Sequence, residues 1–93
     1  MNLRIVYSRQ AEKFIEKNPS ALDEETADRL VVSAVRKILK IEDTSLDLKK
    51  LKADLKNHFR IRHGRIRIVF SLSGKDILVA FVSSIDTRDK VYR

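Results

Sequence analysis

The sequence contains no cysteine, so it offers neither a disulfide framework nor a thiolate metal site, which is typical of a protein of the reducing cytoplasm. Its two histidines, His58 and His63, are too few for their spacing to indicate a metal site. No apolar run approaches the ~20 residues that cross a bilayer, and the N-terminus lacks the apolar segment of a signal peptide. We therefore expect a cytoplasmic protein that needs no metal, cofactor or membrane.

Repeats, low-complexity tracts and internal linkers are also missing from the 93 residues. This length suits one small domain, which we place at residues 1–93. A hydrophobic fraction of 43% predicts a modest core.

Positive charge is what the sequence has in excess, and it is unevenly distributed. Residues 1–48 contain 8 lysines and arginines against 9 acidic residues, whereas residues 49–93 contain 12 against 4. The first half is therefore expected to be scaffold, and the second to meet an anionic partner. Nucleic acid is the first candidate and an acidic protein the second.

The N-terminal half predicts one strand and two helices. Leu3 to Tyr7 is β-prone and suits an edge or second strand. Ser8 is expected to cap a helix that runs to about Lys17. Ser20 is expected to cap a longer helix that runs to about Ile41, because apolar residues recur there at spacings of three and four.

The C-terminal half predicts strands. Residues 42–48 are expected to form a polar connector, and residues 49–57 either a helical turn or an irregular approach to the next strand. A hairpin over residues 59–70 is followed by a turn at 73–76 and an almost continuously apolar central strand at 77–82. We therefore predict an α+β domain of order β-α-α-β-β-β. It would have an antiparallel sheet of about four strands, with an N-terminal two-helix hairpin packed on one face.

Apolar and basic residues alternate strictly through the predicted hairpin. With His63-Gly64 as a two-residue loop, Arg62 would face Arg65 and Arg60 would face Arg67. The four arginines would then share one sheet face, and apolar residues would cover the other. Because like charges paired in this way are destabilising, the pattern favours a phosphate-binding face over a merely solvated one. A loop of another length would divide the arginines between the faces.

Two stretches carry a resemblance to a known family. Residues 51–70, LKADLKNHFRIRHGRIRIVF, resemble the core signature of the RelE/ParE toxin superfamily, and residues 88–93, RDKVYR, resemble the way these toxins end. The resemblance implies a type II toxin of the RelE branch that cleaves mRNA in the ribosomal A site. It also implies an acidic, RelB-like antitoxin as partner, together with ribosome and mRNA.

The resemblance also implies which residues form the site. Arg60 and Arg62 match the basic pair of the family's first hairpin strand, and Arg67 matches the arginine of the second. Arg88 matches the late basic residue, and Tyr92 the C-terminal tyrosine. Two positions depart from the pattern: Arg65 stands where many relatives have an acidic residue, and Ile66 where many have an aromatic one that could stack on a base.

The residue types suit part of the implied chemistry. Guanidinium groups are always charged and bind phosphate oxygens in pairs, so they can stabilise charge on phosphorus, but they do not act as bases. Tyr92 is the preferred proton-transfer group and His63 the reserve, whereas His58 is expected to be structural or solvent-facing. The expected RNA-binding residues, which would contact the backbone without selecting sequence, are Lys49, Lys50, Lys52, Lys56 and Arg65.

Two other functions stay open. One is a ParE-like toxin that inhibits DNA gyrase without RNase activity. The other is a non-catalytic RNA-binding module, which is disfavoured because most of the six Phe and Tyr residues fall in the apolar phase of the pattern.

Overall fold

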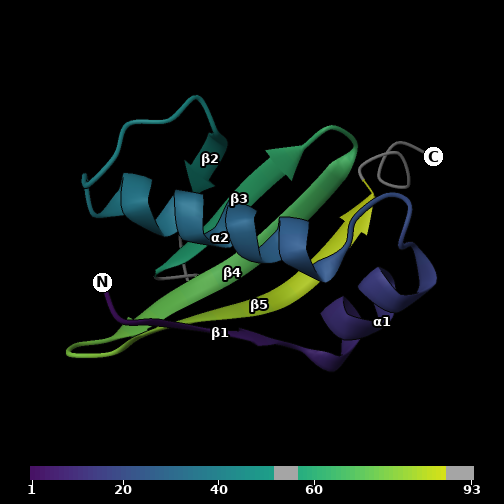
Figure 1. Cartoon of the computed structure of the whole chain (residues 1–93), viewed down its shortest axis with the longest axis horizontal. Coiled ribbons are helices and arrows are strands. Elements are labelled where there is room, and N and C mark those ends of the chain that lie inside the picture. Colours follow the sequence, from purple (N-terminus) through teal and green to yellow (C-terminus); the bar gives the residue numbers. More distant parts are fainter. Residues whose placement is uncertain (52–56, 88–93) are drawn as a thin grey trace.

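Five strands and two helices make up the described part of the chain, residues 1–51 and 57–87 of a computed structural model. Their order is β1 (Leu3–Tyr7), α1 (Arg9–Lys17), α2 (Glu24–Ile38), β2 (Asp47–Lys50), β3 (His58–His63), β4 (Ile66–Gly74) and β5 (Leu78–Thr87). Both helices precede the run of antiparallel strands, as Figure 1 shows. The predicted α+β class is thus confirmed.

The sheet is mixed and larger than predicted. Its strand order is β1-β5-β4-β3-β2, with β1 parallel to β5 and every other pair antiparallel. The prediction of about four antiparallel strands is therefore wrong in strand number and in the direction of β1. Strand β2 was missed because it is short and polar, with Leu48 as its single apolar residue. Its first two residues were predicted as the end of a connector and its last two as a helical turn or an irregular segment.

The helix boundaries follow their caps. Ser8 caps α1 as predicted, since its Oγ accepts a hydrogen bond from the Ala11 N–H at 3.1 Å. Helix α2 is capped by Asp23, whose Oδ1 accepts from the Thr26 N–H at 2.8 Å, so the prediction of Ser20 as cap is wrong. The helix ends at Ile38 rather than Ile41, and the chain turns away at Lys40, which has a φ of 59°.

Both helices pack against the same face of the sheet, and the core lies between these two layers (Figure 1). The helices contribute small and β-branched residues, which allow close approach: Ala11, Ala27, Val31, Ala34 and Val35. The sheet contributes larger ones: Phe59, Ile61, Ile68, Phe70, Val82 and Ile85. The opposite face of the sheet, hereafter the open face, is covered by no described helix.

A β-bulge in β5 keeps the core face continuous. Val69 pairs with Ser84, but Phe70 pairs with Val82, so Ser83 is the extra residue. Strict alternation would send Val82 and Ile85 to opposite faces, because they are three residues apart. With the bulge, both are fully buried in the core, and β5 continues beyond the predicted end at residue 82 to Thr87.

The cap of α2 can be tested against the wrongly predicted one. Asp23→Ala should lower the free energy of unfolding at neutral pH, whereas Ser20→Ala should leave it unchanged. Hydrogen bonding from Thr26 holds the pKa of Asp23 below its usual 3.8. The stabilisation is therefore present above pH 3.8 and is lost as the pH falls through the lowered pKa.

Chemical denaturation of the three proteins at several pH values measures both effects. Equal destabilisation by the two substitutions, or a difference that persists in strong acid, would contradict the assignment of Asp23 as the cap.

Candidate nucleic-acid interface

The register of the β3–β4 hairpin decides where its arginines lie. His63 pairs with Ile66, so the two-residue turn is Gly64-Arg65, and Gly64 adopts a φ of +60°. Arg62 therefore pairs with Arg67, and Arg60 with Val69. The predicted pairs, Arg62 with Arg65 and Arg60 with Arg67, are wrong.

The observed register is favoured by the core. It places Phe59 opposite Phe70, and their rings stack with centroids 5.5 Å apart. Because the buried residues of both strands alternate with the arginines, Arg60, Arg62 and Arg67 all lie on the open face. Arg65 is exposed in the turn, outside both strands. The prediction that four arginines share one face of the sheet is therefore correct for three of them.

Cross-strand pairing arranges the open face in rows. One row, hereafter the charged row, contains Asp47 of β2, Arg62 of β3, Arg67 of β4 and Asp86 of β5. The next row contains Lys49, Arg60, Val69 and Ser84 of the same four strands. Positive side chains outnumber carboxylates in these two rows, and the excess is concentrated over β3.

Two arginines of this face have carboxylate partners. Arg67 donates from Nε and Nη2 to the two oxygens of Asp86, at 3.2 and 3.1 Å. Arg60 donates from Nη2 to Asp47 Oδ1 at 3.0 Å, and its side chain is only 11% exposed. The like charges that the sequence pattern brings together are therefore partly balanced within the fold, by carboxylates that come from neighbouring strands.

Arg62 has no such partner among the described residues. It lies between Asp47 and Arg67 in the charged row, yet Asp47 pairs with Arg60 and Asp86 with Arg67. Its Nε, like that of Arg60, is buried without a hydrogen bond to the described part of the chain, but Arg60 has Asp47 as an ion-pair partner and Arg62 has none. An unsatisfied cation beside a second arginine is an arrangement that a phosphate would stabilise.

The remaining predicted residues fall into three groups. Lys49 is exposed and lies on the open face beside Arg60. Lys50 and His63 are in register with Phe59 and Ile66, so both belong to the helix-covered side, away from the arginines. Four predicted site residues lie outside the described residues: Lys52, Lys56, Arg88 and Tyr92.

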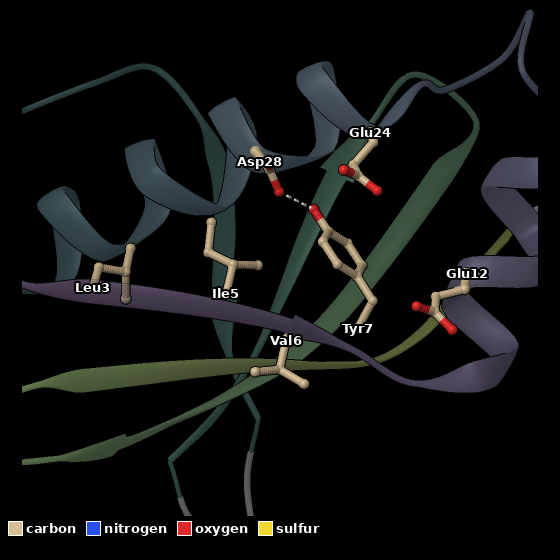
Figure 2. A pocket seen from close by; sticks show the side chains of 7 residues that line it. All are labelled: Leu3, Ile5, Val6, Tyr7, Glu12, Glu24 and Asp28. Carbon is tan, nitrogen blue, oxygen red and sulfur yellow. Dashed lines mark hydrogen bonds between the residues drawn. The ribbon is translucent and has the colours of Figure 1, made fainter.

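A hollow of about 520 Å³ lies on the other side of the sheet, between β1 and the two helices. Figure 2 shows Tyr7 pointing from β1 toward α2, where its hydroxyl donates to Asp28 Oδ1 at 2.6 Å. Burial, together with this hydrogen bond, raises the pKa of Tyr7 above its ordinary value. Glu12 and Glu24 also line the hollow, so its negative charge would repel phosphate, and it is not the nucleic-acid site.

Metal-ligand clusters and membrane-crossing helices are both absent from residues 1–51 and 57–87. No group of three or more histidine and acidic side chains is arranged to hold a metal ion. No helix in these ranges has the length and apolar content needed to cross a membrane.

Sequence reasoning missed three residues of the open face. Asp47 and Asp86 were missed because their strands were not predicted at those positions, and Phe81 because its predicted strand reads as apolar on both sides. Phe81 is in fact 40% exposed on the open face. Phe81 precedes the bulge and could have been found from strict alternation with Ala80 and Val82, which are buried, whereas Asp86 follows the bulge and required the extra residue at Ser83 to be recognised.

Comparison with known proteins gives no match to a protein-family model or to a curated protein. Solved structures do match. The YafQ toxin in the Escherichia coli DinJ–YafQ toxin–antitoxin complex superposes with a TM-score of 0.63 at 12% identity, over 100% of both chains. A YoeB/ParE toxin from Agrobacterium tumefaciens gives 0.61 at 17% identity, over 94% of this chain and 98% of that one.

A third match is to the RelB–RelE antitoxin–toxin complex of Methanococcus jannaschii, with a TM-score of 0.51, 19% identity and 94% of each chain covered. This chain therefore has the fold of the RelE, YoeB and YafQ toxins. The resemblance predicted from residues 51–70 and 88–93 is confirmed at the level of the fold.

The balance of charge on the open face can be tested directly. Asp86→Asn keeps the shape of the side chain but removes the charge that neutralises Arg67, so binding to a polyanion should strengthen by up to about fivefold. Asp76→Asn is the matched control, because it makes the same change in net charge in the exposed β4–β5 turn. Affinity for heparin at fixed salt is the measurement. An equal gain in both variants would show that net charge alone, and not the arginines, sets the affinity.

Proposed function

We propose that this chain is the toxin of a type II toxin–antitoxin system and acts as a metal-independent, ribosome-dependent endoribonuclease that cleaves mRNA in the A site. The observation that carries the proposal is the Arg62–Arg67 pair, which lies partly buried on the open face of a sheet with the RelE, YoeB and YafQ fold. The activity itself is what the family resemblance implies.

The chemistry of such a cleavage has three requirements. The 2′-hydroxyl must lose its proton, charge that develops on the phosphoryl oxygens must be stabilised, and the departing 5′-oxygen must be protonated. Arg62 and Arg67 suit the second requirement, since a phosphate lying across the pair would give Arg62 the ion pair that it lacks among the described residues and would compete with Asp86 for Arg67. Arg60 is more enclosed and held by Asp47, so we assign it mainly to positioning.

Proton transfer is assigned to Tyr92, with Arg88 as a further cation at the phosphate, both from the family resemblance alone. His63, the reserve base, lies on the helix-covered side of the hairpin by register, which counts against it. Lys49 and Arg65 are exposed and suit contacts with the RNA backbone.

A ParE-like inhibitor of DNA gyrase is the second candidate. It is favoured by the similarity to a protein described as a YoeB/ParE toxin, since both activities occur on one fold. The paired arginines favour the nuclease, because RNA cleavage gives them a catalytic task.

Arg62→Ala should abolish growth arrest when the protein is produced in cells, and should slow mRNA cleavage on purified ribosomes by about 100-fold or more. Arg62→Lys should restore only part of the rate, because an ammonium group does not bind two phosphate oxygens in a plane. Arg29→Ala is the matched control, since it removes an exposed arginine from the other side of the molecule.

Unfolding curves of the three variants establish that each still folds. A folded Arg62→Ala variant that keeps full toxicity would show that the open face takes no part in the mechanism.

The proposed partner is a small acidic antitoxin. Two of the similar toxins were crystallised with their antitoxins, DinJ with YafQ and RelB with RelE. The chain carries a formal net charge of +7, and all of this excess arises in residues 49–93, where 12 basic residues stand against 4 acidic ones. An acidic segment would therefore be attracted over a long range and could neutralise the arginines.

We expect the product of a neighbouring gene to bind tightly, with an association rate that falls steeply as salt is added while the dissociation rate changes little. Stopped-flow mixing over a range of ionic strength measures both rates. An association rate that is independent of salt would contradict the electrostatic attraction. Absence of binding would show that the neighbouring gene product is not the antitoxin.

A further inference from the structure

Phe81 occupies an unusual place for an aromatic residue of a central strand. It pairs with Ser71 of β4 on one side and with Val6 of β1 on the other, and Ser71 pairs in turn with His58 of β3. These four residues form one row of the open face, hereafter the Phe81 row. Phe81 is 40% exposed and Val6 is 39% exposed, and Figure 2 shows Val6 pointing away from the helices.

The Phe81 row lies on the same face as the charged row. Along β4, Ser71 is four residues from Arg67, which corresponds to about 14 Å at the rise of an antiparallel strand. Val69 and Ser84 lie between the two rows and present no charge. A short single-stranded segment whose phosphate contacts Arg62 and Arg67 could therefore reach Phe81 without crossing a barrier of like charge.

The surroundings of Phe81 also suit a nucleic acid. Arg4 of β1 pairs with Val79 of β5 in the row beyond, so a further cation flanks the ring. The described open-face residues of the strands at this end of the sheet include no acidic side chain: they are Arg4, Val6, His58, Ser71, Ser73, Val79 and Phe81. An exposed ring flanked by arginine is the arrangement with which sheets stack unpaired bases while charge holds the backbone.

We propose that Phe81 forms a base-stacking subsite for single-stranded RNA, and that Arg4 holds the backbone beside it. The subsite rests on the proposed function, which supplies the RNA. It adds a second point of attachment that binds a flanking nucleotide and so fixes the direction in which the strand crosses the sheet. Because every base offers a π-face, the subsite should bind bases with little sequence preference.

A protein partner fits this patch less well. A stable protein interface buries ~800 Å² on each partner around an apolar centre. Here one ring and two valines are bordered by serines and an arginine, which suits one base better than a helix or strand.

The test uses purified full-length protein and a labelled single-stranded RNA whose 2′-hydroxyls are methylated, so that it cannot be cleaved. Phe81→Leu keeps an apolar side chain but removes the ring, and it should weaken binding by about tenfold. Phe81→Trp should restore or strengthen binding. Ile77→Leu, which changes an exposed apolar residue in the β4–β5 turn, is the matched control and should have no effect.

A series of RNAs, each lacking the base at one position, identifies the contact. The unsubstituted protein should lose affinity when one particular base is removed, and Phe81→Leu should be insensitive to the same removal. Equal sensitivity of the two proteins, or unchanged affinity of Phe81→Leu, would overturn the subsite. Loss of antitoxin binding in Phe81→Leu with RNA binding intact would reassign the patch to the protein partner and overturn it as well.

These outcomes are separable from the proposed nuclease. If the unsubstituted protein cleaves mRNA on ribosomes but binds no free RNA, the subsite is rejected and the nuclease is retained. If Phe81→Leu weakens RNA binding while the unsubstituted protein cleaves no mRNA on ribosomes, the subsite is retained and the nuclease is rejected.

Discussion

Burial of one face of the sheet is the constraint on which the rest of the structure depends. Ile61, Ile68 and Phe70 are fully buried against the helices, and the stacking of Phe59 on Phe70 fixes the hairpin register. Because side chains alternate along a strand, burying these residues forces Arg60, Arg62 and Arg67 onto the open face. A hydrophobic core therefore places the cations, although no local interaction favours the juxtaposition of Arg62 and Arg67.

Carboxylates from the flanking strands make this juxtaposition tolerable. Asp47 on β2 and Asp86 on β5 lie at the two ends of the charged row, where Asp47 binds Arg60 of the next row and Asp86 binds Arg67. Arg62 lies between them without an ion pair to the described residues. This arrangement holds Arg60 and Arg67 in place while it leaves Arg62 without a carboxylate partner among the described residues. An incoming phosphate would thus meet groups that are already oriented, which reduces the cost of binding it.

Features that depend on a local pattern of residues could be predicted from the sequence. Features that depend on the pairing of distant strands could not. The α+β class, the cap of α1 and the facing of three arginines follow from period and capping chemistry, which neighbouring residues encode. The pairing of Asp47 and Asp86 with arginines, the parallel pairing of β1 with β5, and the exposure of Phe81 depend on strands far apart in the chain or on the bulge at Ser83. The cap of α2 was predicted at Ser20 and not at Asp23 because serine and aspartate are both favoured at this position, and sequence alone does not rank them.

The central claim is that the open face acts on RNA and not on gyrase. The most direct measurement is to map transcript 5′ ends and chromosomal supercoiling together in cells shortly after the protein is induced, with an Arg67→Ala strain in parallel. If the open face cleaves mRNA, new 5′ ends should appear within translated regions, in phase with codons and absent from the Arg67→Ala strain, while supercoiling is unchanged. Intact transcripts accompanied by trapped gyrase and altered supercoiling would contradict it.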